Sequence, residues 1–344
     1  MYTRAHRIWI PSLVLVLAAS PLAAVDGVLE VAQACVADGC FPGDGPGFPV
    51  EIIRPGSYRL TGDLVVPDAA STAISIAVSG VTLDLNGFGL RGVVVCSGVP
   101  PQCAPAGTGR GVDAAGQEHV IVRNGEIRGF GDSGVAVGPL SLLEDLQLTS
   151  NGGHGARLGF MAEMRRCASS SNGGQGVSGD LGAVVRDSRF AGNAGAGVGT
   201  LVGSVVERNI SRSNQGDGIV AGAGSRIDGN DVQGHSGGSG LLCTGGSCRI
   251  ADNRVTGNGT GIACGGPCQA IANQVFSNSG AGIALSGAAG GLLAGNWVAS
   301  NGGVGLDLNA SAGYRENVVQ DNSGGEVNGG VNLGANLCGP ALCP

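Results

Sequence analysis

The sequence has no lysine, few aromatic residues and little charge. All 19 of its strongly basic residues are arginine, so neither a lysine Schiff base nor a lysine general base is available. Aromatic residues make up 3% and charged residues 13% of the 344 positions, which requires a core of small and branched side chains. The formal net charge of -7 argues against nucleic acid and anionic membranes as partners.

Glycine, by contrast, is abundant and supplies 67 residues. It does not recur at every third position, which excludes a collagen triple helix. A disordered chain would be polar and highly charged, whereas 42% of these residues are hydrophobic. The composition therefore indicates a folded protein with many tight turns.

The first 24 residues have the organisation of a signal peptide. Arg4 and Arg7 precede an apolar stretch at 8–19, and Leu22-Ala23-Ala24 resembles a cleavage site. The apolar stretch is too short to cross a bilayer, and no later segment has 18 unbroken apolar residues. We expect an exported protein (periplasmic, cell-surface or extracellular) without a membrane span once the signal is removed. A retained N-terminal anchor is the alternative.

The cysteines agree with export. Ten of the 11 fall into close pairs: Cys35 with Cys40, Cys96 with Cys103, Cys243 with Cys248, Cys264 with Cys268 and Cys338 with Cys343. Close pairing in an exported chain predicts local disulfides, although Cys243 and Cys264 could also bond between coils. The four cysteines from 243 to 268 could alternatively hold zinc. We expect disulfides, no metal and no cofactor, with Cys167 as a buried free thiol.

Internal repeats are the strongest signal in the sequence. A glycine followed by a small or branched apolar residue recurs about every 21 residues, at Gly134, Gly155, Gly176, Gly197, Gly218, Gly240, Gly261, Gly282 and Gly305. A polar column precedes these glycines, at Asn151, Asn172, Asn193, Asn214, His235, Asn258, Asn278, Asn301 and Asn322. A second column lies about five residues before the first, at Asn209, Asn230, Asn253, Asn273, Asn296 and Asn317.

This repeat predicts an all-β fold, a single-stranded right-handed parallel β-helix. Three short apolar bursts in each unit of about 21 residues are too short for helices and fit three strands per coil. Coils stacked about 4.8 Å apart would let inward asparagines form hydrogen bonds from coil to coil. We expect roughly 10 to 12 such coils.

The same pattern divides the chain. We predict a signal peptide at 1–24, an N-terminal cap at 25–48 with the pair Cys35 and Cys40, and the β-helix at 49–333. An insertion loop at about 92–111 interrupts the early coils, and a C-terminal cap at 334–344 contains Cys338 and Cys343. Caps are expected because exposed terminal strand edges of a solenoid promote polymerisation.

Several segments carry a resemblance to a known family. They are VLEVAQACVADGCFPGDGPGFPVEIIRPGSYRLTGDLVV, VTLDLNGFGLRG, GRGVDAAG and VRNGEIRGFGDSGV, together with the loop between Cys96 and Cys103. The mature chain resembles secreted bacterial right-handed parallel β-helix repeat proteins of the pectin-lyase-like superfamily, a family without an assigned activity. The resemblance implies fold and export. The wider superfamily is similar to polysaccharide lyases, hydrolases and epimerases, but no catalytic motif accompanies the resemblance.

Strand alternation predicts which residues face outward after each repeat glycine. These are Ala136, Arg157, Ser178, Gly199, Val220, Leu242, Ala263, Ala284 and Asp307. Most are small or apolar. The two ionisable residues among them lie seven coils apart, about 34 Å, and cannot act as a pair.

Charge gathers instead in another register. The candidate ligand-contacting residues are Glu144, Asp145, Arg165, Arg166, Arg186, Asp187, Glu207 and Arg208. Stacked coils would place opposite charges side by side, as ion pairs on a solvated turn or as a groove for an anionic or hydroxylated ligand. Asp145 and Asp187, about 10 Å apart with Arg166 between them, form the acid pair whose separation suits hydrolysis.

Other candidates carry weaker signals. His154 and Asp217 share a turn position three coils apart, too far for a dyad, and structural roles are favoured. Trp297 and Tyr314 could form a small sugar-stacking patch, but we favour the alternative that both rings simply pack on the surface or in the core.

These observations predict an exported, monomeric and non-catalytic β-helix protein, a scaffold that binds a polysaccharide or another surface component. The alternative is a carbohydrate-active enzyme acting on an acidic polysaccharide: a lyase, a hydrolase or an epimerase. We name no catalytic residue.

Overall fold

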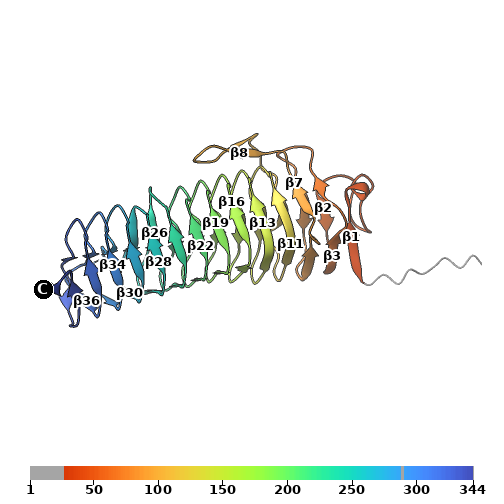
Figure 1. Cartoon of the computed structure of the whole chain (residues 1–344). Coiled ribbons are helices and arrows are strands. Elements are labelled where there is room, and N and C mark those ends of the chain that lie inside the picture. The colour runs from red at the N-terminus through yellow and green to blue at the C-terminus, as the bar shows by residue number, and fades with distance from the viewer. Residues whose placement is uncertain (1–26, 288–289, 344) are drawn as a thin grey trace, which may run out of the picture.

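The computed structural model describes residues 27–287 and 290–343. The expected signal peptide lies outside these residues. The described chain winds as an elongated solenoid whose strands stack in parallel from one end to the other (Figure 1). Apart from a single turn of 3-10 helix, η1 (Gln33–Cys35), the regular elements of the described residues are strands. The all-β parallel β-helix predicted from the repeat is confirmed.

The first strand of each coil belongs to a sheet that contains 13 strands in the described residues. In order, these strands are β2 (Val50–Ile52), β5 (Ile74–Ile76), β10 (Val112–Ala114), β12 (Val135–Val137), β14 (Ala156–Leu158), β17 (Val177–Gly179), β20 (Val198–Thr200), β23 (Ile219–Ala221), β26 (Ser239–Cys243), β29 (Thr260–Cys264), β32 (Ile283–Leu285), β35 (Leu306–Asp307) and β38 (Val327–Asn328). We call the outer surface of this sheet the first-strand face. The expectation of 10 to 12 coils was therefore too low, because the opening coils have longer connections that hide the repeat.

The second strand of each coil stacks in the same way. This row contains β1 (Val28–Val31), β3 (Gly56–Leu60), β6 (Val81–Asp84), β11 (Ile121–Arg128), β13 (Leu142–Thr149), β15 (Glu163–Arg165), β18 (Val184–Arg186), β21 (Val205–Glu207), β24 (Arg226–Asp228), β27 (Cys248–Ala251), β30 (Cys268–Ile271), β33 (Gly291–Ala294), β36 (Ala312–Arg315) and β39 (Val331–Asn332). β11 and β13 are long enough to continue into the third row, so they join the two rows into one sheet.

The third row completes each coil. It contains β4 (Leu64–Val65), β7 (Gly89–Arg91), β16 (Ala168–Ser170), β19 (Arg189–Ala191), β22 (Ile210–Arg212), β25 (Asp231–Gln233), β28 (Arg254–Thr256), β31 (Gln274–Phe276), β34 (Trp297–Ala299), β37 (Val318–Gln320) and β40 (Leu337–Cys338). At the carboxyl end β41 (Ala341–Leu342) folds back antiparallel on β40. A separate hairpin, β8 (Val95–Ser97) and β9 (Gln102–Ala104), projects from the side of the solenoid within the expected insertion (Figure 1).

Strand alternation builds the core. In β14, Ala156 and Leu158 are buried while Arg157 between them is exposed, and the first and third positions of β12, β17 and β20 are buried as well. The interior is filled mainly by valine, isoleucine, leucine and alanine, as the low aromatic content requires. In the described residues, no helix is long and apolar enough to cross a membrane.

Both polar columns point inward, as predicted. Asn172 donates from Nδ2 to Oδ1 of Asn193 at 2.9 Å, and Asn193 repeats the contact with Asn214 at 2.9 Å. Each Oδ1 also accepts the backbone N–H of the preceding coil's asparagine. His235 replaces an asparagine and is fully buried, and its backbone N–H donates to Oδ1 of Asn258 at 3.0 Å.

The disulfides follow the predicted pairing within the described residues. Each of the five bonds joins cysteines four to seven residues apart: Cys35 bonds to Cys40, Cys96 to Cys103, Cys243 to Cys248, Cys264 to Cys268 and Cys338 to Cys343. Cys243 and Cys264 are register neighbours on adjacent coils, yet each bonds within its own loop. The expectation of local bonds is therefore confirmed against the alternative of a bond between coils.

Three of these bonds lie outside the regular coils. The bond between Cys35 and Cys40 closes the segment that precedes β2, and the bond between Cys338 and Cys343 ties β40 to the chain end beyond β41. Cys96 and Cys103 face each other across the β8–β9 hairpin. These three disulfides stabilise the two ends and the insertion, where few coil-to-coil contacts are available.

Cys167 remains a free thiol and is buried. Burial raises the pKa of this thiol to about 12, which keeps it neutral and unreactive. The predicted buried thiol is confirmed.

Candidate functional site

The first-strand face has the predicted outward residues. Register pairing connects Ala136, Arg157, Ser178 and Gly199 on successive coils, and the column continues to Asp307. It also extends toward the amino terminus through Asp113. This carboxylate was missed by sequence reasoning because the insertion loop separates it from the regular repeats.

Two arginines and two aspartates form a network at the amino-terminal part of this face. Arg110 donates from Nε to Oδ2 of Asp132 at 2.9 Å and from Nη1 to Oδ1 of Asp113 at 3.0 Å. Arg157 donates from Nη2 to the other oxygen of Asp132 at 3.1 Å and from Nε to Oγ of Ser133 at 2.8 Å. We call these five residues the arginine–aspartate network. Arg110 and Asp132 lie about one repeat apart in sequence, a spacing that could have revealed their contact.

The network fixes the charge of its members. Burial raises the pKa of Asp132, but the hydrogen bond from Arg110 and the charge of Arg157 outweigh burial and hold the pKa below its ordinary value. Asp132 is therefore ionised at neutral pH. An ionised, doubly paired carboxylate positions arginines well and cannot donate a proton.

His154 lies beside this network. Its Nδ1 accepts the backbone N–H of Gln175 at 3.0 Å, so the proton of the neutral ring is on Nε2. Burial and then the charge of Arg157 lower the pKa of His154, which keeps it neutral. Asp217, its expected counterpart, accepts the N–H of Ser239 at 2.6 Å, a structural role.

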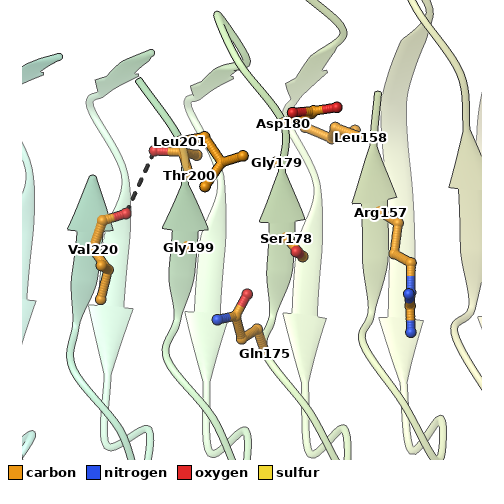
Figure 2. A pocket seen from close by; sticks show the side chains of 10 residues that line it. All are labelled: Arg157, Leu158, Gln175, Ser178, Gly179, Asp180, Gly199, Thr200, Leu201 and Val220. Carbon is orange, nitrogen blue, oxygen red and sulfur yellow. Dashed lines mark hydrogen bonds between the residues drawn. The ribbon is translucent and has the colours of Figure 1, made fainter. Parts of the chain in front are cut away.

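An open groove of about 400 Å³ continues from Arg157 across β14, β17, β20 and β23. Figure 2 shows Arg157 at one end, Ser178 on its strand and Gln175 beside Gly199. A Cβ atom at Gly199 would lie 2.6 Å from Oε1 of Gln175, so a larger residue there would require this flexible side chain to turn away. Asp180 and Leu201 line the opposite side.

The groove is polar without being strongly charged. Gln175, Ser178 and Thr200 supply neutral donors and acceptors, while Arg157 and Asp180 contribute one charge of each sign. Thr200 donates to the carbonyl of Val220 at 3.4 Å (Figure 2). Such a surface can bind a hydroxyl-rich chain laid along several coils.

The structure places the eight candidate residues of the charged register on the second row and the bend that follows it. Arg165 and Arg166 donate to Oε2 of Glu144 at 2.7 and 2.9 Å, and Arg166 also contacts Asp145 at 2.8 Å. Arg208 contacts Asp187 at 2.8 Å and Glu207 at 2.9 Å.

One partner in this register was missed. Arg186 forms an ion pair with Glu163 at 2.6 Å. Glu163 lies on the neighbouring coil, two positions before Arg165 on the same strand. Residues two apart on a strand point to the same side, so alternation could have identified this partner.

Arginine holds the two predicted acid residues ionised. The hydrogen bond from Arg166 lowers the pKa of Asp145, and that from Arg208 lowers the pKa of Asp187. A depression of about 450 Å³ lies between them, with Arg166 and Arg189 in its lining. Its use as a ligand site stays a prediction.

Trp297 and Tyr314 do not form the sugar-stacking patch, and for Tyr314 the favoured alternative of simple packing is confirmed. Tyr314 is only 2% exposed and packs in the core. Trp297 is 48% exposed and contacts Phe276 instead. The register pairs Phe276 with Ala299 and Trp297 with Gln274, so the repeat spacing alone does not reveal this contact.

Metal binding gains no support from the cysteines from 243 to 268, because their sulfurs are paired in disulfides. Within residues 27–287 and 290–343, no group of three or more histidine, cysteine or acidic residues is arranged to hold a metal ion.

The stacked parallel strands form a right-handed parallel β-helix. The family model described as "Right handed beta helix region" matches residues 110–255. A search of curated proteins finds no significant sequence match.

Two solved structures of carbohydrate-active enzymes have similar folds. The periplasmic alginate epimerase AlgG has a TM-score of 0.60 at 13% identity, covering 91% of this chain and 84% of its own. The catalytic unit of a GH87 alpha-1,3-glucanase from Streptomyces thermodiastaticus has a TM-score of 0.54 at 14% identity, covering 82% of this chain and 62% of its own. At such identities the likeness establishes the fold alone.

Proposed function

We propose that the protein is a non-catalytic polysaccharide-binding protein that holds an extended saccharide along the first-strand face. The observation that carries this proposal is the open groove over β14, β17, β20 and β23, which begins at the arginine–aspartate network. Five disulfides in the described residues, and the likeness to a periplasmic epimerase, are consistent with an extracytoplasmic protein. We propose export through the predicted signal peptide and action as a monomer.

The groove suits an extended ligand because it is rigid and lies along the stack of coils. Its lining residues stand on adjacent coils, about 4.8 Å apart, so successive residues of an extended saccharide can each contact a different coil. Gly199 has no side chain, so the Gln175 amide can lie over the backbone at this position. A preformed site of this kind loses little conformational entropy on binding.

Electrostatics favour binding over chemistry. General acid catalysis by a carboxyl group at neutral pH needs a raised pKa, and the pKa values of Asp132, Asp145 and Asp187 are all lowered. Their arginine partners also occupy the oxygens that would have to accept a proton. These groups are better suited to orienting hydroxyl or carboxylate groups of a ligand.

A carbohydrate-active enzyme acting on an acidic polysaccharide is the second candidate. His154 favours it, because a neutral imidazole with its proton on Nε2 lies beside Asp132 and Arg157. The two similar solved structures are an epimerase and a glucanase by name.

Affinity electrophoresis and calorimetry with soluble uronate polymers and neutral glucans test the proposal, together with assays for cleavage and epimerisation. We expect binding without turnover, weakened about tenfold by Arg157→Ala or Gln175→Ala. Arg315→Ala is the matched control, since Arg315 is exposed on the second-row strand β36 and lines neither the groove nor the depression of the charged register, and thermal unfolding verifies that each variant is folded.

The outcomes separate the two candidates. Turnover abolished by His154→Ala or Asp132→Asn would establish an enzyme in the groove, and turnover abolished by Asp145→Asn or Asp187→Asn would move the site to the charged register. Equal binding by the wild type and both groove variants would refute the groove.

A further inference from the structure

A row of three flat side chains, exposed at its two ends and half-buried in the middle, lies on third-row strands near the carboxyl end of the solenoid. It consists of Arg254 on β28, Phe276 on β31 and Trp297 on β34, and we call it the aromatic strip. The three strands are adjacent in the stack, so each member is one coil from the next (Figure 1). The strip is on a different row of strands from the groove.

The strip is ordered by its own contacts. The Arg254 guanidinium lies 4.9 Å from the centre of the Phe276 ring, at cation–π distance. Phe276 and Trp297 have ring centres 6.3 Å apart and planes inclined by 32°. Arg254 is held from the other side by Asp231 on the preceding coil, at 3.2 Å. Three flat groups are therefore fixed before any ligand arrives.

Packing within the protein does not use the whole surface of the strip. The side chain of Arg254 is 46% exposed, and Trp297 is 48% exposed. Aromatic residues are only 3% of the sequence, and the large rings of Tyr58, Phe130 and Phe190 are buried. An exposed tryptophan in such a chain leaves a large apolar surface in water, and a ligand that covers it gains the hydrophobic free energy.

We propose that the aromatic strip is a second saccharide-binding site, in which a pyranose ring stacks on Trp297. The chemistry fits because a sugar has an apolar C–H face and a polar rim. Gln274 stands between Arg254 and Trp297 in the register and is exposed, so its amide and the guanidinium can meet hydroxyl or carboxylate groups at the rim. The indole N–H adds a further donor.

The orientation of the bound chain follows from the spacing of the strip. Its members advance one coil at a time, about 4.8 Å, which is comparable with the width of a pyranose ring. A polysaccharide running parallel to the solenoid axis can place one sugar on Trp297 and another over Phe276 and Arg254. This site does not rest on the groove proposed above.

Fluorescence provides a direct test. Trp9 and Trp297 are the two tryptophans of the sequence, so in the protein without residues 1–24 all tryptophan emission comes from Trp297. Hexasaccharides of alginate, of polygalacturonate and of α-1,3-glucan are titrated while emission and acrylamide quenching are recorded. We expect at least one to change the emission and protect the indole. Protection by both uronates and not by the glucan would assign Arg254 to a carboxylate.

Variants locate the effect. Phe276→Leu and Arg254→Ala should each weaken the fluorescence-detected affinity several-fold, and Trp297→Leu should weaken calorimetric binding by about tenfold in a groove-disabled Arg157→Ala background. Phe160→Leu is the matched control, because Phe160 is 47% exposed on a turn outside the strip. Thermal unfolding of each variant separates lost binding from lost folding.

The result that overturns the proposal is the absence of any change in Trp297 emission or quenching with all three hexasaccharides at millimolar concentration. Loss of the response in Arg157→Ala or Gln175→Ala would also overturn it as an independent site. If calorimetry detects groove binding while Trp297 stays fully quenchable, the strip is refuted and the groove stands.

Discussion

The bend between the second and third strands of each coil is built in two ways along the solenoid. In the coils around residues 140–190, the inward residues are Leu146, Cys167 and Ser188, and arginine–carboxylate pairs lie outside. From Asn209 onward every inward residue is an asparagine, and these side chains bond continuously to Asn336. We call the second arrangement the asparagine ladder.

The backbone is the same in both regions. The residue before the inward position has a positive φ throughout, at Asn124, Asp145, Arg166, Asp187, Arg208, Gly229, Asp252, Ala272, Gly295, Glu316 and Ala335. This conformation costs free energy for most side chains, so something must hold it. In the ladder, each inward Oδ1 accepts the buried N–H of the preceding coil's bend, as Asn253 does for Asn230 at 2.9 Å.

The ion pairs of the first region cannot replace this support. The pairs at the bend position are exposed, as in Arg166 with 49% and Asp145 with 48% of the side chain accessible, and exposed pairs contribute about 0 to 1 kcal/mol. Glu144, on the strand before the bend, is only 12% accessible. The bend N–H groups still find inward acceptors there, such as Ser188 Oγ for Cys167 at 3.1 Å. The comparison indicates that the inward hydrogen bond holds the bend and that the ion pairs are secondary.

Replacing a middle member of the asparagine ladder should have the largest effect on stability. In Asn253→Leu, the N–H of Asn230 loses its acceptor and the carbonyl of Ile227 loses its donor, both in buried surroundings. Because each buried group left unpaired costs about 1 to 3 kcal/mol, we expect a loss of about 3 kcal/mol or more. Urea unfolding followed by circular dichroism measures it.

The matched control is Gln233→Leu, which also introduces leucine but on an exposed outward position of β25. Its effect should stay within about 0.5 kcal/mol. Similar losses for the two variants would contradict the inward role of the ladder.

The sequence predicted the fold and both inward columns, because a constant repeat fixes which residues stack whatever the exact strand bounds. It even predicted that His235 would replace an asparagine and that Cys167 would stand in the column of Leu146 and Ser188, which the inward hydrogen bonds bear out. Such placements need only the period and the alternation of strand side chains.

The candidate site was less predictable. Arg110 lies at the end of the predicted insertion and Asp113 directly follows it, so the spacing of about one repeat to Asp132 was the available signal for their register. The contact between Gln175 and Gly199 depends on a side-chain rotamer over a missing Cβ, which no repeat encodes.

Cys167→Asn sharpens the comparison by extending the asparagine ladder one step further into the first region. The Cys167 sulfur lies 3.8 Å from the carbonyl oxygen of Leu143, at the place where the Nδ2 group of a ladder asparagine donates to the equivalent carbonyl. Ser188 Oγ lies on the next coil and already accepts the backbone N–H of residue 167. We expect a gain of about 0.5 to 1 kcal/mol in the free energy of unfolding.

Cys167→Ala provides the reference, because it removes the sulfur without adding an amide and should lower stability by about 1 kcal/mol. The expected order is therefore asparagine above cysteine above alanine. An asparagine variant less stable than the alanine variant would mean that this bend cannot accept the ladder geometry.

The smallest effect concerns the ion pairs and appears as a pH dependence. Hydrogen bonds from Arg166 and Arg208 lower the pKa values of Asp145 and Asp187 in the folded state. A lowered carboxyl pKa stabilises the fold above the unfolded-state pKa, and this contribution disappears as the pH falls through the folded-state value. Stability should therefore fall less between about pH 6 and pH 3 in Asp145→Asn and Asp187→Asn than in the wild type.

Because these ion pairs are exposed to solvent, the fall in stability of each variant should differ from that of the wild type by less than about 1 kcal/mol, and a higher salt concentration should reduce this difference further. Asp252→Asn is the matched control, since Asp252 occupies the same bend position in the asparagine ladder and forms no ion pair with any residue that the structure describes. Urea unfolding of the wild type and the three variants at several pH values measures the slope of the free energy of unfolding against pH. Slopes that are equal in all four would show that the ion pairs add nothing to the bends, whereas a change above about 2 kcal/mol would reverse the ranking of inward and outward support.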